Sequence, residues 1–147
     1  MYRCILVATD GSDLCAKAVD SAIAMAVLAG AQLVALRVVA HYQQVFFEGA
    51  LPPNVEDVDQ IEKEWVEGGQ ITVNIVKSAA EAKGVKTTAV VVKSGVVSEA
   101  IIQTAALHQC DLIVMASHRR SGLKRLLLGS ETLNVLTHST TPVLVLR

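Results

Sequence analysis

The chain has 147 residues, of which 52% are hydrophobic and 3% aromatic, and its formal net charge is −1. This length allows one domain with a substantial core, and so apolar a composition excludes a disordered chain and a multidomain enzyme. The balanced charge gives no overall attraction to nucleic acid or to an anionic membrane, so we expect neither as a partner.

The amino-terminal residues do not predict export. Their apolar run ends at Asp10 and is too short for a signal peptide. Gly30 and Gln32 interrupt the apolar stretch 22–36, which predicts a helix and then a strand in place of a membrane span. The sequence has three cysteines, Cys4, Cys15 and Cys110. They form no CxxC pair and leave an odd thiol, so we expect a reducing, cytoplasmic environment and cysteines that fill the core.

The first third of the chain predicts a β-α-β unit. Residues 4–9 form a short apolar run typical of a buried strand, and Ser12 follows as the cap of a helix that Gly30 ends. Residues 33–39 predict the second strand, which lies parallel to the first after a right-handed crossover. The helical spacing predicts a buried face made of Ala16, Val19, Ile23, Ala26 and Val27.

The pattern breaks between residues 40 and 54. This segment has no helical period, and a proline pair ends it. It holds three of the few aromatic side chains, Tyr42, Phe46 and Phe47. A loop of this length packs on the core, forms a lid or presents a partner surface, and we expect packing.

Residues 55–83 allow two interpretations. The segment 71–76 resembles a strand by propensity, but apolar residues at alternating spacings of three and four predict one long helix. Gly68 and Gly69 lie inside it, where each costs about 1 kcal/mol relative to alanine, so a kink there is one outcome. The predicted buried face contains Val58, Ile61, Trp65, Gly68, Thr72, Ile75, Ala79 and Ala82.

The second half of the chain repeats the alternation of strands and helices. The predicted strands are residues 86–93, 111–117 and 142–146. The predicted helices are residues 97–108 and one that begins near Gly129 and Ser130. In the first of these helices the inward side chains are expected to be Ile101, Ile102, Ala105 and Ala106. This alternation predicts an open parallel α/β sheet in a single domain.

Polar side chains follow the predicted strands at their carboxyl ends, where such sheets bind ligands. Thr9 and Asp10 follow the first strand, and Ser117 ends the fourth. The loop after the fourth strand is basic, with His118, Arg119, Arg120, Lys124 and Arg125 ahead of a helix start. Backbone amides at a helix start beside arginine and lysine can bind phosphate. A solvated basic loop fits the charge pattern equally well.

Four segments in order carry a family resemblance: residues 5–12 (ILVATDGS), 111–115 (DLIVM), 126–130 (LLLGS) and 141–145 (TPVLV). With them the sequence resembles the universal stress protein family over nearly its whole length. The resemblance implies a single domain over residues 1–147 with a doubly wound open sheet of five parallel strands, in the order 3-2-1-4-5, and four helices. It also implies a cytoplasmic, stress-linked regulatory role and a homodimer.

Nucleotide-binding members of that family carry glycine, two residues, glycine, nine residues, glycine, and then serine or threonine. Gly129 and Ser130 match this pattern, whereas Ala116 and Arg119 stand at the first two glycine positions. Alanine adds one methyl group, but arginine fills space where glycine lets the backbone approach phosphates. The Arg119 guanidinium could instead bind a phosphate directly.

The resemblance implies ATP as ligand, with Mg²⁺ bound only through the nucleotide. The implied site consists of Thr9, Asp10, Val38, Ala116, Ser117, His118, Arg119, Gly129, Ser130, Glu131 and Thr132. Asp10 would face the nucleotide, Val38 would meet the adenine through its backbone, and Ser130 would hold a terminal phosphate. Their structural alternatives are a turn residue, an ordinary strand end and a helix cap. Glu131 suits the helix dipole but adds negative charge near a triphosphate.

Enzyme signatures are lacking: the sequence has no GxGxxG, no GxxxxGK followed by serine or threonine, and no GxSxG. The four histidines have no metal-ligand spacing. We therefore expect no catalytic or metal-binding residues. Slow ATP hydrolysis ranks last, because His118 has no orienting partner in the sequence pattern.

Two functions remain open. One is a nucleotide-binding sensor, and the other is a nucleotide-free interaction module whose ATP site was lost through Ala116 and Arg119. In both, the apolar strand at residues 142–146 forms a sheet edge that needs cover. The resemblance implies pairing of this strand with its copy in a homodimer. Which other protein partner it has is not specified by the sequence.

Overall fold

The computed structural model of the protein describes residues 1–42, 55–117 and 128–147. Its elements in chain order are β1 (Cys4–Ala8), α1 (Asp13–Ala29), β2 (Gln32–Val39), α3 (Val55–Glu81), β3 (Thr87–Lys93), α4 (Val97–Leu107), β4 (Leu112–Ala116), α5 (Ser130–His138) and β5 (Val143–Leu146). The five strands are parallel and lie in the order β3-β2-β1-β4-β5, which confirms the expected doubly wound sheet. The predictions for Phe46, Phe47 and the basic loop at 118–127 lie outside the described residues.

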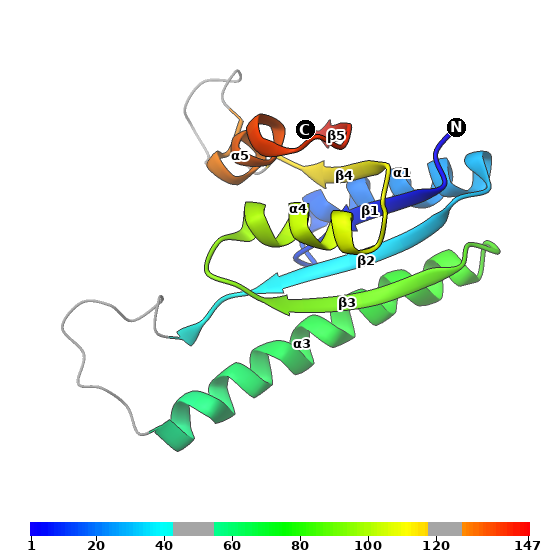
Figure 1. Cartoon of the computed structure of the whole chain (residues 1–147). Helices are drawn as coiled ribbons and strands as arrows, with labels where there is room; N and C mark the ends of the chain where they lie inside the picture. The colour runs from blue at the N-terminus through cyan, green and yellow to red at the C-terminus, as the bar shows by residue number, and fades with distance from the viewer. Residues whose placement is uncertain (43–54, 118–127) are drawn as a thin grey trace.

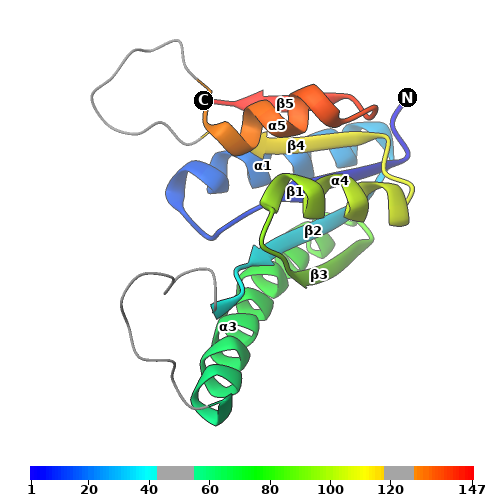
Figure 2. The same ribbon diagram turned by 60° about the vertical axis from the view of Figure 1, so that its left-hand side comes forward.

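The four described helices cover the two faces of the sheet in pairs (Figures 1 and 2). Helices α1 and α3 pack on one face, where Ile5 and Val7 of β1 point, and α4 and α5 pack on the other, where Leu6 points. The amino end of α3 projects past the carboxyl ends of the strands. Among the described helices, none is both long enough and apolar enough to cross a membrane.

Helix α1 has the predicted ends but a different buried face. The Ser12 hydroxyl accepts a hydrogen bond from the Cys15 amide at 3.3 Å, and Gly30 adopts φ 66° at the carboxyl end. The buried residues are Cys15, Ala18, Ala22, Ile23 and Ala26. The prediction was therefore wrong for Ala16 and Val27, which are exposed. Apolar residues surround most of this helix, so their spacing does not single out one stripe.

Helix α3 is one continuous helix, as its periodicity predicted, but its buried face is also rotated. The buried residues of its second half are Gly69, Val73, Val76 and Ala80. The prediction was wrong for Gly68 and Ala79, which are exposed, and for Ile75, whose exposed fraction is 65%. Ala82, beyond the end of the helix, is exposed as well. The predicted face continued from Trp65 to Gly68, three residues on. In the structure it continues to Gly69, four residues on, because Gly69 is the glycine that lies against β2 and β3.

Helix α4 follows its prediction in part. Ile101 and Ala105 are buried, Ile102 is half-buried, and Ala106 is exposed, contrary to expectation. Ser98 and Thr104 occupy buried positions instead, because α4 presses against both the sheet and α5.

Candidate functional site

The turn after β1 is built from side chains that bond their own backbone. The Thr9 hydroxyl accepts a hydrogen bond from the Gly11 amide at 3.1 Å, and the Asp10 carboxylate accepts one from the Ser12 amide at 2.8 Å. Gly11 has φ 81°, a conformation that favours glycine. Asp10 therefore has the structural role of a turn residue, and its exposed carboxylate is fixed at the carboxyl edge of the sheet.

Val38 directs its backbone toward the same edge. Along β2, hydrogen bonds alternate between neighbours: Leu36 accepts from Thr9 at 2.9 Å on the β1 side, and Val39 accepts from Ser94 at 3.0 Å on the β3 side. By this alternation the amide and carbonyl of Val38 face β1, at the level where β1 has ended. Its side chain packs into the core between the sheet and helices α4 and α5. Only the backbone of Val38 is placed to meet a ligand at this edge.

Ser117 joins the end of β4 to the start of α5. It is fully buried, its amide donates to the Leu146 carbonyl at 2.8 Å, and its hydroxyl accepts from the Gly129 amide at 3.3 Å. Ala116, just before it, is also buried. These contacts hold the helix start beside the carboxyl edge of the sheet. His118 and Arg119 lie outside the described residues.

The first turn of α5 presents backbone amides. Gly129 is the cap residue and Ser130 is the first helical residue, so the interpretation of Ser130 as the cap was wrong. Gly129 has no side chain that could cap this end, and the first bond along the helix runs from the Leu133 amide to the Gly129 carbonyl at 3.0 Å. The amides of Ser130, Glu131 and Thr132 precede that bond, which leaves them without an intrahelical acceptor. Such a helix start attracts anions.

Glu131 uses its carboxylate on a neighbouring helix. Its Oε2 accepts a hydrogen bond from the Ser98 amide at 2.9 Å, in the first turn of α4. The cap residue of α4, Val96, supplies no side-chain hydrogen bond. Glu131, which belongs to α5, therefore caps the start of α4. Thr132, the next residue, is buried. The negative charge of Glu131 is thus placed on the positive end of the α4 dipole.

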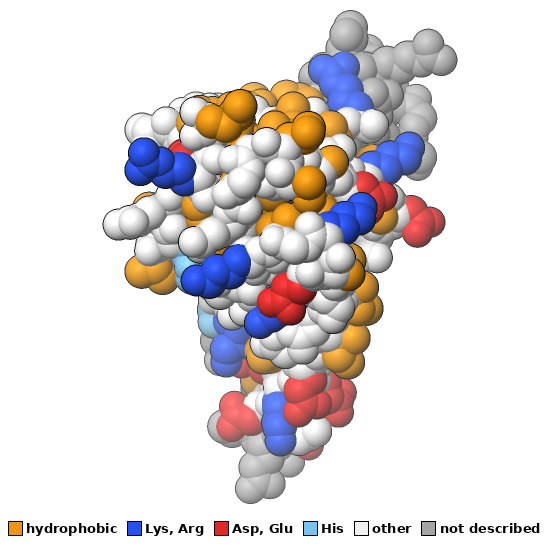
Figure 3. Space-filling model, turned by 90° about the vertical axis from the view of Figure 1, so that its right-hand side faces the viewer, with side chains coloured by type: hydrophobic (Ala, Val, Ile, Leu, Met, Phe, Trp, Pro, Cys, Tyr) orange, Lys and Arg blue, Asp and Glu red, His pale blue; other side chains and the backbone are white. Residues whose placement is uncertain are grey.

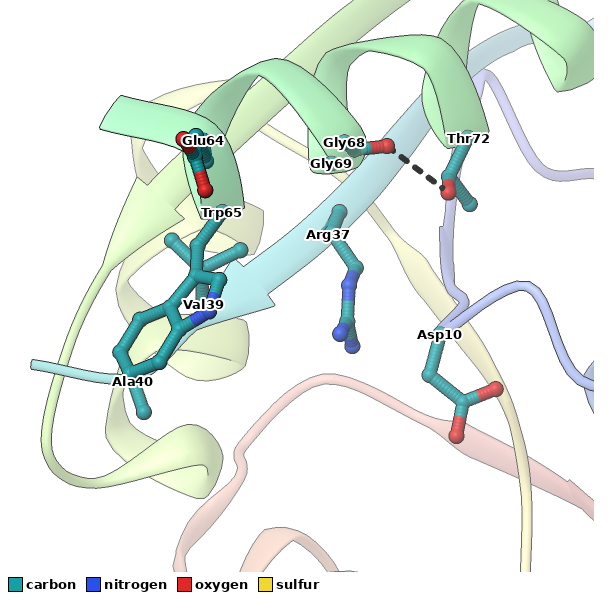
Figure 4. Close-up of a pocket in the computed structure, with 9 residues that line it drawn as sticks. All are labelled: Asp10, Arg37, Val39, Ala40, Glu64, Trp65, Gly68, Gly69 and Thr72. Atoms are coloured by element: carbon teal, nitrogen blue, oxygen red, sulfur yellow. Dashed lines mark hydrogen bonds between the residues drawn. The ribbon is translucent and has the colours of Figure 1, made fainter. Parts of the chain in front are cut away.

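A hollow of about 400 Å³ adjoins Asp10 on the α3 side of the sheet (Figure 4). It is lined by Asp10, Arg37, Val39, Ala40, Glu64, Trp65, Gly68, Gly69 and Thr72. Figure 4 shows the Arg37 side chain extending from β2 into the hollow, and the Trp65 side chain reaching from α3 toward the end of β2. No hydrogen bond or ion pair links the Arg37 guanidinium to another of the described residues.

Sequence reasoning missed Arg37 and Trp65. Arg37 is the single charged residue in β2, whose other residues are apolar except for Gln32. Trp65 is the only tryptophan of the chain. A lone cation in a buried strand was the available signal. It did not indicate which face the side chain occupies, because that depends on the partner helix.

The residue before the undescribed segment 43–54 is fixed to α3. The Tyr42 amide donates to Glu62 Oε1 at 2.9 Å, and the Tyr42 ring stacks on Trp65 with centroids 6.0 Å apart. Lys93 Nζ lies 3.5 Å from Glu62 Oε2, and His41 Nδ1 lies 3.9 Å from Oε1. The hydrogen bond from the Tyr42 amide, together with the charges of Lys93 and His41, holds the pKa of Glu62 below its usual range. Tyr42 thus packs as expected.

We expect acidification to loosen this corner before it unfolds the chain. The lowered pKa of Glu62 means that its stabilising effect is present above the usual glutamate value of 4.5 and is lost as pH falls through the lowered value. Trp65 fluorescence, followed from pH 7 to 3, should change in this range as Tyr42 leaves the ring. The change should be absent in Glu62→Gln and retained in Glu64→Gln, a matched variant two residues along the same helix. An acid step that persists in Glu62→Gln would assign it to another group.

The described residues contain no group of three or more histidine, cysteine, aspartate or glutamate side chains placed to hold a metal ion. The candidate site consists of the backbone amides at α5, the Asp10 carboxylate, the Val38 backbone and the hollow beside Arg37. These parts provide hydrogen-bond donors for an anion and a partly apolar space for a flat ring.

Solved structures share this fold. The structure of hypothetical protein MJ0577, from Methanocaldococcus jannaschii, has a TM-score of 0.81 and 29% identity, over 99% of this chain and 96% of that one. A universal stress protein in complex with cAMP has a TM-score of 0.69 at 23% identity, over 99% of this chain and 97% of that one. A universal stress protein from Archaeoglobus fulgidus in complex with dAMP has a TM-score of 0.63 at 19% identity, over 99% and 98% of the two chains.

Sequence comparison gives the same family. The model described as the universal stress protein family matches residues 1–147. Universal stress protein YxiE of Bacillus subtilis is 34% identical over 149 residues, which cover 100% of both chains. The chain therefore belongs to the universal stress protein family.

Proposed function

We propose that the protein is a cytoplasmic, homodimeric regulator, one domain over residues 1–147, that binds an adenine nucleotide, ATP, at the carboxyl edge of its sheet. The observation that carries this proposal is the placement of the hollow and of the α5 amides on either side of Asp10. Ligands of doubly wound sheets bind at such an edge, where the strand order reverses. Here the order reverses between β1 and β4.

The two halves of the site are spaced for one nucleotide. The hollow lies over β2, and the α5 start is tied to the end of β4, with β1 between them. Two strand spacings separate β2 from β4 by roughly 10 Å, a span that a base, a ribose and phosphates can bridge. The base would occupy the hollow, and the phosphates would accept hydrogen bonds from the amides of Ser130, Glu131 and Thr132 and from the Ser130 hydroxyl.

The lining of the hollow suits an adenine ring. Trp65 lines the hollow with apolar ring surface, against which a base can pack. Arg37 offers donors and Asp10 offers an acceptor, which matches the mixed edge of adenine with its ring nitrogens and amino group. The solved family members in complex with cAMP and dAMP support an adenine nucleotide as the class of ligand.

The test begins with the protein as purified. It is denatured, any released nucleotide is identified by chromatography, and the stripped protein is titrated with ATP by calorimetry and by Trp65 fluorescence. We expect binding in the micromolar range and a change in Trp65 emission, which inorganic triphosphate should not cause. Ser130→Ala and Arg37→Leu should each weaken binding about tenfold. Arg3→Leu, an arginine at the opposite edge of the sheet, is the matched control and should change nothing.

A nucleotide-free interaction module is the second candidate. It is favoured by Ala116 and Arg119, which replace two glycines of the nucleotide-binding pattern. If it is correct, the purified protein releases no nucleotide and ATP gives no heat. Arg119→Gly separates the two, because restored binding in that variant identifies arginine as the obstacle. Unchanged affinity in Arg119→Gly would show that the arginine is accommodated.

A further inference from the structure

Two cysteines that are far apart in the sequence meet at the amino edge of the sheet. Cys4 begins β1 and Cys110 precedes β4, and their Sγ atoms lie 3.2 Å apart. The strands fix this pairing, because Ile5 pairs with Leu112 and the Asp111 amide donates to the Cys4 carbonyl at 2.9 Å. Figure 3 shows this end of the molecule, where hydrophobic side chains are exposed between charged ones.

The Asp111 carboxylate holds the backbone around the pair. It accepts hydrogen bonds from the Arg3 amide at 2.9 and 3.1 Å and from the Cys4 amide at 3.1 Å. The two sulfur atoms therefore need to approach by only about 1.2 Å to reach the S–S bond length of about 2.05 Å. The register of β1 and β4 thus already brings the two sulfur atoms close to bonding distance.

The surroundings give the two thiols different roles. Cys4 is half-buried, so a small oxidant can reach it, whereas the exposed fraction of Cys110 is 7%. Burial, the contact with Cys4 and the charge of Asp111 raise the pKa of the Cys110 thiol far above its usual range. Cys15 is separated from both, because it lies in the core on the other face of the sheet. Burial raises the pKa of the Cys15 thiol as well.

We propose that Cys4 and Cys110 form a peroxide-oxidised site that closes to an intramolecular disulfide. The Cys4 thiol loses its proton and the thiolate attacks one oxygen of hydrogen peroxide. The O–O bond breaks, and the departing hydroxide takes up that proton, so Cys4 sulfenic acid and one water form. The Cys110 sulfur then attacks the Cys4 sulfur, the S–O bond breaks, and the departing hydroxide takes the Cys110 proton to give a second water. Two thiols are oxidised to one disulfide, and one peroxide is reduced to two waters.

This proposal stands apart from the nucleotide site, which is at the opposite edge of the sheet. The disulfide would link the start of β1 to the start of β4 across most of the chain, and so long a closed loop restricts the unfolded state strongly. We therefore expect oxidation to raise Tm by roughly 5–10 °C.

The test uses the reduced full-length protein, treated with hydrogen peroxide and then alkylated. We expect loss of two free thiols, a peptide pair linked through Cys4 and Cys110, a mass lower by two hydrogen atoms, and full reversal by dithiothreitol. In Cys110→Ser, Cys4 should stop at the sulfenic acid, which dimedone traps. In Cys4→Ser, Cys110 should remain reduced over the same time.

Cys15→Ser is the matched control and should oxidise like the wild type. Three results would overturn the proposal: thiols that all survive the treatment, a disulfide between two chains, or a linked peptide that contains Cys15. Reaction of Cys110 in Cys4→Ser at the wild-type rate would overturn the assigned order of attack.

Discussion

Replacing Gly69 with valine is expected to lower the free energy of unfolding by about 3 kcal/mol, and replacing it with alanine by about 1 kcal/mol. A Cβ atom on Gly69 would lie 3.0 Å from Arg37 Cγ and 3.2 Å from the Cγ1 atoms of Val39 and Val91. The Arg37 side chain can shift, but the two valines are β-branched and stiff, so part of the strain also pushes α3 away from the sheet. The close approach of helix and sheet therefore depends on glycine at this position.

The neighbouring glycine supplies the control. A Cβ atom on Gly68 would meet nothing within 4 Å, so Gly68→Ala keeps only the gain in helix propensity and should raise the free energy of unfolding by up to about 1 kcal/mol. Urea denaturation of the single variants measures both effects on the same helix. Equal effects at the two positions would contradict the close packing of Gly69.

The second large effect is expected at the outer edge of β5, the last strand of the sheet. In this strand Pro142 and Leu146 accept hydrogen bonds from Ile113 and Ser117 of the β4 side, at 2.9 and 2.8 Å. By the alternation of a parallel pair, Val143 and Val145 turn their amides and carbonyls away from β4. Val145→Pro removes one outward amide without breaking a bond to β4. If the proposed dimer forms through this edge, the variant should raise the dimer dissociation constant by at least about 100-fold.

Its control is a proline one residue away. Leu144→Pro removes an amide that faces β4, so it should destabilise the fold itself. Sedimentation or light scattering of Val145→Pro, with Tm measured in parallel, separates loss of the dimer from loss of the fold. A Val145→Pro variant that stays dimeric, or a wild type that is monomeric at micromolar concentration, would exclude β5 pairing.

Gly69 also connects stability to the proposed site. The atom nearest to its missing side chain is Arg37 Cγ, and the guanidinium of that residue extends into the hollow. A side chain at position 69 would displace Arg37 and would also narrow the hollow. Gly69→Ala should therefore weaken ATP binding, whereas the effect of Gly68→Ala on binding should be smaller.

The sequence determined the local features of the fold. Ser12 and Gly30 mark the ends of α1 because caps act within a few residues of the chain. The spacing of apolar residues identified α3 as a helix in spite of its β-branched segment 71–76. The alternation of elements gave the parallel α/β class, and the family resemblance gave the strand order.

The rotation of each helix was decided by tertiary packing. In α1 and α3 several stripes are apolar, and the one that is buried depends on the shape of the opposing sheet. Gly69 lies against β2 and β3 while Ile75 is exposed, a difference that the spacing of apolar residues does not contain. The same packing put Arg37 and Trp65 into one hollow, so half of the candidate site was not predicted.

Long-range pairs were likewise decided by the tertiary structure. No sequence motif near Cys4 or Cys110 indicates that the two residues pair, and the sequence predicted only that the cysteines fill the core. They meet because strand order places β4 beside β1, and register then aligns the two ends. Glu131 reaches Ser98 for the same kind of reason, because α4 and α5 share one face of the sheet. Caps and periodicity act between near neighbours in the chain, whereas these contacts follow from how whole elements pack.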